Sequence, residues 1–341
     1  MAIHSSSENR PPIRYLFTRM LLSRIDLLSD KRKAQIKFQV VTLLKTLSVF
    51  DEAHSGRIRF LLSRLLPWDP LSGLPSNPIS LFVLTTKKDL AVLPLSLYSI
   101  IEVLSSEGGG VTIVCPESDI ENVRLVTNSL RSKHSFEIKS DESILSRNSL
   151  KRMDFPNSHS LMQVMKFLCS IESTTDDCLV LDGDTVFFRN KVWSSGESMT
   201  LIVPPEYNQA HVGFVRMNFA FFPHHRLGFT TQSQLIRRSL ILSLIESSGG
   251  LNKFVKIFTT SMKQANKHSF PCEWQLYGDW VCSTLGKKVF VSSYLNKSLV
   301  RSAVLDHTLE NASFVDLHNL FIDLRRQFPS HGSISLHAYK N

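Results

Sequence analysis

Apolar runs alternate with amphipathic segments from residue 79 to residue 188, and this alternation limits the possible folds more than any other feature. Most of the runs are short and continuous, as expected of strands that are buried on both faces. The strands predicted in this way cover residues 79–86, 111–116, 136–143 and 178–188, and the helices between them cover 89–106, 117–133 and 160–171. This order predicts an α/β fold, in which helices pack on both faces of a mostly parallel sheet.

The composition excludes several classes of protein. Hydrophobic residues make up 43% of the 341 residues, whereas a disordered chain lacks the apolar surface that folding requires. Glycine and proline number only 14 each, which excludes a collagen-like or low-complexity chain. We therefore expect one large domain at residues 76–341, preceded by an extension and linker at residues 1–75.

The predicted extension is basic. Residues 1–75 hold 12 of the 39 Lys and Arg but only 6 of the 30 Asp and Glu. Their basic and apolar pattern predicts helices within residues 15–66, which either cap the main domain or lie on an anionic membrane surface. The first residues lack the apolar stretch of a secretion signal, and no apolar stretch approaches the roughly 20 residues of a membrane helix. We expect a cytoplasmic protein whose membrane contact, if it has one, is peripheral.

Common nucleotide-binding and hydrolase motifs are absent from the sequence. It contains no G-x-x-x-x-G-K-[ST] loop, no G-x-G-x-x-G after a strand and no G-x-S-x-G turn. No nucleic-acid-binding module is recognisable, so we expect no nucleic acid partner. The five cysteines show no metal-ligand spacing.

The most informative motif is Asp182-Gly183-Asp184, which directly follows a predicted strand. Ligands of α/β sheets bind at the carboxyl ends of strands, so both carboxylates would lie at the mouth of a site. Two carboxylates one residue apart can hold one hard cation, and Mg²⁺ or Mn²⁺ bound in this way keeps positions for phosphate oxygens. The alternative is a polar turn between strands, where Asp and Gly are common.

Two enzyme families use this signature. Glycosyltransferases of the GT-A type place D-x-D after a central strand, and haloacid-dehalogenase-type phosphohydrolases use D-x-D-x-(T/V), which Asp182, Asp184 and Val186 fit. The phosphohydrolase motif stands near the start of its domain and is followed by a later acidic pair. Here strands and helices precede the motif, and Asp279 has no acidic partner in the segment that follows it. The chain therefore resembles the GT-A type, in which the nucleotide-binding half comes before D-x-D.

A more specific resemblance extends over residues 79–340. The segment ISLFVLTTKKDLAVLPLSLYSI, the pair Gln163-x-x-Lys166 and the segment PCEWQLYGDWV (271–281) are similar to the KDL, QxxK and ExxxYG elements of a little-characterised group of GT-A-like glycosyltransferases. They occur in the order of that group, with D-x-D between the second and the third. The aromatic stretch that precedes the Gln in that group is replaced here by Pro156-Asn-Ser-His159.

The resemblance implies roles for residues that would bind the donor, a nucleotide sugar. A cation on Asp182 and Asp184 would neutralise the leaving β-phosphate. Residues at the end of the first strand would meet the nucleotide, and Lys166 would reach a phosphate unless it is merely a solvated helix residue. Gln163 would bind the donor or make a structural hydrogen bond. The implied donor- and cofactor-binding residues are Thr85, Thr86, Lys88, Asp89, Gln163, Lys166, Asp182 and Asp184.

The resemblance also implies roles on the side of the acceptor, a glycan or another hydroxyl compound. Glu273 is the candidate general base, with Asp279 in reserve, and its alternative role is that of an acid at a helix N-terminus. A histidine near the C-terminus is the candidate third metal ligand, either His337 or, failing that, His331. Residues 211–226 are predicted to form strands beneath the acceptor site. Besides the phosphohydrolase, the remaining alternative is an inactive GT-A-like scaffold that binds anionic partners.

Overall fold

The computed structural model describes residues 71–104, 110–131, 135–203, 208–219, 221, 228–266, 268–292, 296–305, 308–329 and 331–338. The helices predicted within residues 15–66 lie outside these ranges, as does most of the predicted extension. Within the described ranges, no helix combines the length and the apolar character needed to cross a bilayer.

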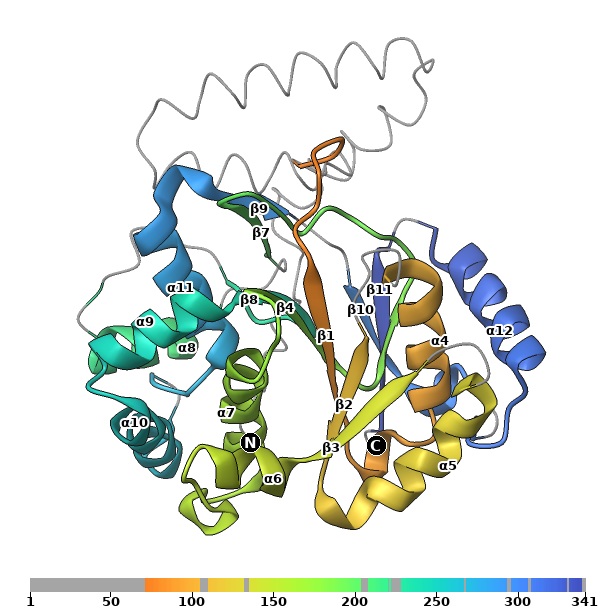
Figure 1. Ribbon diagram of the computed structural model, residues 1–341, viewed down its shortest axis with the longest axis horizontal. Coiled ribbons are helices and arrows are strands. Elements are labelled where there is room, and N and C mark those ends of the chain that lie inside the picture. Colours follow the sequence, from red (N-terminus) through yellow and green to blue (C-terminus); the bar gives the residue numbers. More distant parts are fainter. Residues whose placement is uncertain are drawn as a thin grey trace, which may run out of the picture.

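A five-stranded sheet forms the centre of the molecule, in the order β3-β2-β1-β4-β8 (Figure 1). Its strands are β1 (Ile79–Leu84), β2 (Val111–Cys115), β3 (Phe136–Ser140), β4 (Asp177–Asp182) and β8 (Ser233–Arg237). The first four run parallel, and β8 pairs with β4 in the antiparallel sense. Nearly every residue of β1, β2 and β4 is buried, because helices cover both faces of the sheet. The predicted mostly parallel sheet is confirmed.

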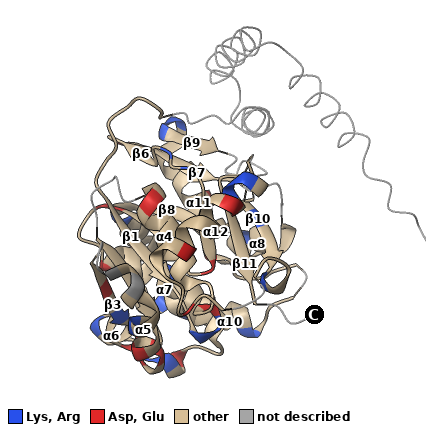
Figure 2. Cartoon of the chain, turned by 90° about the vertical axis from the view of Figure 1, so that its right-hand side faces the viewer, with Lys and Arg blue, Asp and Glu red and all other residues tan. Residues whose placement is uncertain are grey.

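The helices form two layers, one on each side of this sheet (Figure 1). One layer holds α4 (Leu93–Leu104), α5 (Ile120–Arg131) and α12 (Phe314–Gln327). The other holds α6 (Asp141–Arg147), α7 (Ser158–Ile171), α8 (Gln209–Asn218), α9 (Arg238–Ser247), α10 (Leu251–Lys263) and α11 (Glu273–Leu285). Basic and acidic residues lie close together along the chain around α5 and α6 (Figure 2). One ion pair there joins Arg147 of α6 to Glu172 at 3.2 Å.

Two small sheets accompany the central sheet within the described ranges. One has the order β10-β11-β5 and consists of β5 (Thr185–Phe187), β10 (Asn296–Val300) and β11 (Ser333–His337). The other has the order β6-β7-β9 and consists of β6 (Ser194–Ser195), β7 (Ser198–Ile202) and β9 (Val289–Ser292). Single turns η1 (Lys87–Asp89), η3 (Glu117–Asp119), η4 (Arg152–Asp154), η5 (Gly286–Lys288) and η6 (Arg301–Ala303) connect these elements. Because β11 runs antiparallel to β5, its last residue lies beside the end of β4.

The prediction of strands within residues 211–226 is wrong for the residues described there, because α8 occupies 209–218. The side chain of Asn208 accepts a hydrogen bond from the Ala210 N–H at 2.9 Å and caps the helix. Val212 and Val215 are then buried one helical turn apart, together with Phe214. The predicted strand at 136–143 is also shorter, since Ser140 ends it and caps α6 by accepting from the Ser143 N–H.

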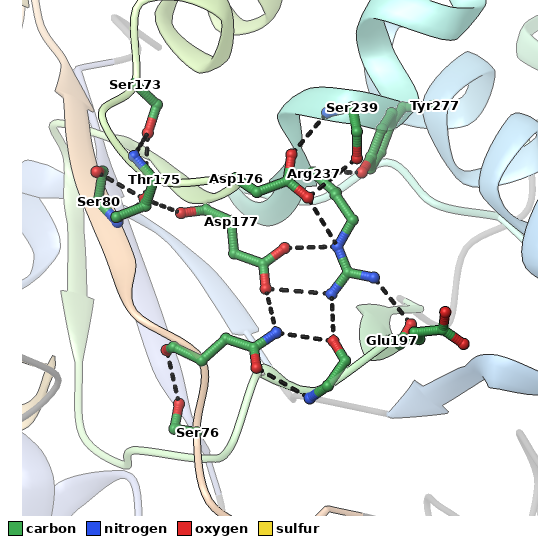
Figure 3. Close-up of polar contacts among 12 residues, drawn as sticks. Ser76, Ser80, Ser173, Thr175, Asp176, Asp177, Glu197, Arg237, Ser239 and Tyr277 are labelled. Atoms are coloured by element: carbon green, nitrogen blue, oxygen red, sulfur yellow. Dashed lines mark hydrogen bonds and ion pairs between the residues drawn. The ribbon is translucent and has the colours of Figure 1, made fainter.

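A hydrogen-bonded ion pair fixes the amino end of β4 (Figure 3). Arg237 Nε and Nη2 donate to the two carboxylate oxygens of Asp177 at 2.7 and 3.1 Å, and Asn77 adds a third hydrogen bond at 2.8 Å. The Arg237 N–H donates to the Tyr277 hydroxyl at 2.6 Å. These contacts tie β4 to β8 and α11, and so set the position of the opposite, carboxyl end of β4.

Candidate active site

The Asp-Gly-Asp turn lies where the carboxyl ends of β1 and β4 meet. Leu84 is paired with Asp182 in the parallel register, and the Gly183 N–H donates to the Leu84 carbonyl at 2.8 Å. A Cβ on residue 183 would stand 2.8 Å from the Thr85 side chain and 3.0 Å from the Leu84 carbonyl. Only glycine therefore allows the two strand ends to approach this closely, which brings Thr85 against the acidic turn.

A buried lysine joins the first aspartate to the candidate base. Lys166 Nζ lies 3.1 Å from Asp182 Oδ1 and 2.8 Å from Glu273 Oε1, and it also stands 4.7 Å from the centre of the Trp274 ring. The Lys166 side chain is 10% exposed and that of Glu273 is 6% exposed, so Lys166 is not a solvated helix residue. Burial opposes the charge of Lys166, but the two carboxylates outweigh it and raise the lysine pKa.

The second aspartate contacts His337. Asp184 Oδ2 and His337 Nδ1 are 2.9 Å apart, and this contact, opposed by burial, raises the pKa of the imidazole. The other oxygen, Asp184 Oδ1, is buried without a hydrogen-bond partner among the described residues. Burial together with the charge of Asp184 raises the pKa of Asp182 to about 6, although Lys166 acts in the opposite direction.

The end of β1 continues into η1, which faces the acidic turn. Asp89 accepts hydrogen bonds from the Thr86 N–H at 3.3 Å and from its hydroxyl at 3.1 Å. Burial and the charge of Asp184 raise the pKa of Asp89. Lys88 is exposed, and its charge contributes to the pKa shifts of Asp89 and His337.

The sequence did not reveal Arg301, which belongs to this site. Arg301 Nη1 donates to the Lys88 carbonyl at 2.8 Å, and Nη2 lies 3.9 Å from Asp89 Oδ1. Its Nε and Nη2 are enclosed without a hydrogen-bond partner among the described residues. A single arginine between short apolar pairs carries no local signal, so only the tertiary contact identifies it.

Residues of the QxxK and ExxxYG elements also position this site. Gln163 Nε2 donates to the Pro271 carbonyl at 3.0 Å, which holds the start of α11 against α7. Further along α11, a Cβ on residue 278 would stand 2.2 Å from the Phe229 ring, so Gly278 allows close packing. Gln163, Tyr277 and Gly278 thus bring Lys166 and Glu273 together.

Two of the predicted residues lie elsewhere. Asp279 is fully buried and accepts a hydrogen bond from Gln275 Nε2 at 3.0 Å; burial raises its pKa to about 8. None of its described contacts joins it to the acidic turn. His331 is near Lys297 and Arg189, whose charges add to burial in lowering its pKa, and it is likewise outside the cluster.

A hard cation fits the pair Asp182 and Asp184 better than it fits the predicted set of three ligands, which also includes His337. Carboxylate oxygens suit Mg²⁺ or Mn²⁺, and Asp184 Oδ1 is a buried oxygen that still needs a partner. Among the described residues, however, no group of three His, Cys, Asp or Glu is arranged to hold a metal. His337 uses Nδ1 on Asp184, which suits a residue that orients a carboxylate ligand.

The sequence matches no known protein family, and no curated protein matches it. Among solved structures, mouse xyloside xylosyltransferase 1 is similar over 76% of this chain and 98% of its own, with 12% identity and a TM-score of 0.42. The galactosyltransferase LgtC is similar over 75% and 86%, with 13% identity and a TM-score of 0.40. The glycosyltransferase GlyE of Streptococcus pneumoniae TIGR4 is similar over 77% and 55%, with 9% identity and a TM-score of 0.38.

Proposed function

We propose that the protein is a metal-dependent glycosyltransferase, which moves a sugar from a nucleotide-sugar donor to a hydroxyl acceptor. The observation that carries this proposal is that Lys166 contacts both Asp182, the first aspartate of the acidic turn, and Glu273. It joins a pair of cation-binding carboxylates to a buried carboxylate that can accept a proton. A transferase needs both functions within the length of one sugar ring.

The donor side is formed by the ends of β1 and β4. Asp182 and Asp184 would hold Mn²⁺ or Mg²⁺, and the bound ion would act as a Lewis acid toward the charge of the leaving phosphate. Thr85, Thr86, Lys88 and Asp89 follow β1 and are proposed to contact the nucleotide. Arg301 adds donors beside Asp89, and a planar guanidinium suits phosphate oxygens.

The acceptor side is formed by the start of α11. In an inverting transfer, the oxygen of the acceptor hydroxyl attacks the anomeric carbon of the donor sugar, and the hydroxyl proton passes to Glu273. The bond from the anomeric carbon to the β-phosphate oxygen breaks, and its electron pair leaves with the phosphate. Lys166 keeps Glu273 in place by donating a hydrogen bond of 2.8 Å to its Oε1.

The phosphohydrolase alternative is less well supported. It requires Asp182 as a nucleophile and a later acidic pair to hold its cation. The nearest other carboxylates have different partners, since Glu273 pairs with Lys166 and Asp89 bonds to Thr86. Glu273 is therefore better placed to act as a base opposite the cation site, and these residues do not supply the second acidic pair that a phosphohydrolase needs.

The test is calorimetric titration of UDP and GDP into the full chain, with and without Mn²⁺. We expect metal-dependent binding of one nucleotide, lost in the Asp182→Asn/Asp184→Asn variant. Asp323→Asn on α12 is the matched control, because Asp323 is an exposed acid whose side chain is 62% accessible.

Circular dichroism and thermal unfolding would establish that each variant is folded. If the folded wild type binds neither nucleotide, the transferase proposal is wrong. Phosphorylation of Asp182 by a phosphate ester would then favour the phosphohydrolase. Binding of anionic vesicles without either activity would favour the scaffold.

A further inference from the structure

The loop before α11 presents an aromatic ring between two histidines. Phe270 is partly exposed, and its ring centre lies 5.9 Å from that of His159 and 6.0 Å from that of His211. His159 is in the first turn of α7 and His211 is in the first turn of α8. We call these three residues the aromatic shelf. No residue of the shelf has a role in the proposed transfer described above.

Backbone contacts hold the shelf in place. The Phe270 N–H donates to the Ala210 carbonyl at 3.0 Å, while the next carbonyl, that of Pro271, accepts from Gln163. A Cβ on residue 213 would stand 2.0 Å from the His268 carbonyl oxygen, so the glycine there lets α8 touch the loop. The loop is therefore clamped between α7 and α8, and Phe270 is held at the surface by packing.

The two histidines differ in what they can offer a ligand. His211 is engaged at both nitrogens, by Thr230 Oγ1 at 2.9 Å and by Asn208 Nδ2 at 3.2 Å. His159 is exposed and uses Nε2 with Gln163 at 2.9 Å, and its Nδ1 makes no hydrogen bond to the described residues. His211 therefore positions the phenyl ring, whereas His159 has a nitrogen available to a hydroxyl group.

The shelf lies near Glu273, and its surroundings favour the neutral form of both histidines. Partial burial of the rings lowers the pKa of both His159 and His211, although part of the His159 side chain stays exposed, and the charge of Glu273 acts on each in the opposite direction. A metal site is not the explanation, since these histidines and Glu273 form no group arranged to hold an ion within the described ranges. The shelf is thus an uncharged aromatic surface beside the candidate base.

We propose that the aromatic shelf is the acceptor site, and that it binds the sugar ring of a glycan acceptor. A pyranose ring has an apolar face, which matches Phe270, and hydroxyl groups at its rim, which match His159 Nδ1. Glu273, three residues after Phe270, would accept the proton of a further hydroxyl on that ring. The inference rests on the proposed transferase function and specifies the substrate class of the same site.

The first test measures sugar binding without any nucleotide. Saturation-transfer NMR of the full chain with methyl glycosides of glucose, galactose, mannose, xylose and N-acetylglucosamine would detect a bound ring. We expect a signal for at least one glycoside, and its loss in Phe270→Leu, which keeps an apolar side chain but removes the aromatic face. Phe136→Leu is the matched control, because Phe136 is a partly exposed ring at the other end of the sheet.

The second test separates the acceptor from the donor. In transfer assays with the bound glycoside, Phe270→Leu should raise the acceptor KM about tenfold, as loss of an aromatic contact predicts. His159→Ala should raise it as well. Calorimetric nucleotide binding and hydrolysis of the donor by water should stay unchanged in both variants. His318→Gln should leave every readout unchanged, because His318 is an exposed residue of α12 whose Nδ1 contacts the Tyr98 hydroxyl at 2.8 Å.

Each outcome decides a different question. An unchanged acceptor KM in Phe270→Leu, or no glycoside signal in the wild type, overturns the aromatic shelf while leaving nucleotide binding intact. Transfer to serine or threonine peptides instead of glycosides also overturns it, since the hydroxyl would come from a protein. Failure of the wild type to bind nucleotide contradicts the transferase itself, and the NMR signal then stands as a separate result.

Discussion

The two ends of β4 both carry an aspartate in contact with a cationic side chain, but they differ in how completely their polar atoms are paired. At the amino end, both oxygens of Asp177 and all three nitrogens of the Arg237 guanidinium have hydrogen-bond partners (Figure 3). At the carboxyl end, Asp184 keeps a buried oxygen without one among the described residues. Complete hydrogen bonding is typical of a structural contact. A buried oxygen without a hydrogen bond, next to groups of like charge, indicates a site where a bound ligand supplies the missing partner.

A cavity lies at the amino end of β4, and its polar groups differ from those of the carboxyl end in the same way. A cavity of about 520 Å³ is lined by Asn77, Asp177, Arg237 and their neighbours. Its size would suit a small ligand, but the charged groups in it already satisfy one another. A cavity alone is therefore weaker evidence for function here than the unsatisfied oxygen at the other end of the same strand.

The largest expected effect is on stability, at the amino end. Arg237→Met leaves Asp177 buried without its cation, and breaking a buried pair in this way costs about 3–5 kcal/mol. Urea unfolding would measure the loss in the free energy of unfolding. Arg238→Met is the matched control, because its side chain is exposed and one position further along. Equal losses in the two variants would contradict a structural role specific to Arg237.

A substitution at the carboxyl end of β4 should affect activity much more than stability. Asp184→Asn removes one negative charge near Asp182 and Asp89 but also weakens the contact with His337, so we expect the free energy of unfolding to change little. Transfer activity, in contrast, should fall by about 100-fold to 1000-fold, as expected when a charge that stabilises the transition state is lost. Steady-state kinetics and urea unfolding on the same sample would check both. A large loss of stability would make Asp184 a structural residue like Asp177.

The sequence allows the sheet and the acidic turn to be predicted because both depend on local pattern. Apolar runs mark β1, β2 and β4, and the motif 182–184 directly follows a strand. Pairing between Lys166 and Glu273 depends instead on how α7 packs against α11, which no local pattern contains. The KDL, QxxK and ExxxYG elements named these residues only through resemblance to other proteins.

His159 and Arg301, which the sequence analysis did not identify, lack even a resemblance to a known motif. His159 lies in the segment that departs from the resembling group, and Arg301 belongs to no recognisable motif. The aromatic composition of residues 211–226 favours strands by propensity, yet the Asn208 cap and the helical spacing of Val212 and Val215 decided the outcome. That cap was visible in the sequence and could have corrected the prediction.

A smaller effect concerns pH. The pKa of Asp279 is about 8 because the group is buried, whereas an unfolded aspartate titrates near 3.9. Between these pH values the folded state holds a proton that the unfolded state releases, so the stability contributed by Asp279 is present below pH 4 and is lost as pH rises toward 8. From pH 6 to pH 8 the loss is about 2–3 kcal/mol.

Asp279→Asn should remove this dependence, because the amide is neutral at every pH and still accepts the hydrogen bond from Gln275. The check is urea unfolding of the wild type and the variant at pH 6, 7 and 8. Asp323→Asn should follow the wild type. If the variant keeps the full pH dependence, Asp279 is ionised in the folded protein and becomes available again as a base.

The smallest expected effect tests an exposed charge at the edge of the carboxyl-end cluster. Lys88 and Lys87 are adjacent, exposed lysines of the same turn, but the charge of Lys88 contributes to the pKa shifts of Asp89 and His337. Lys88→Met should weaken nucleotide binding about threefold at low salt, because an exposed charge contributes less than about 1 kcal/mol. At 1 M salt the difference should vanish, since screening then acts within about 3 Å. Lys87→Met is the paired control in the same calorimetric titration. An equal loss of nucleotide affinity in both variants at low salt would mean that the turn contributes only general positive charge, with no contact specific to Lys88.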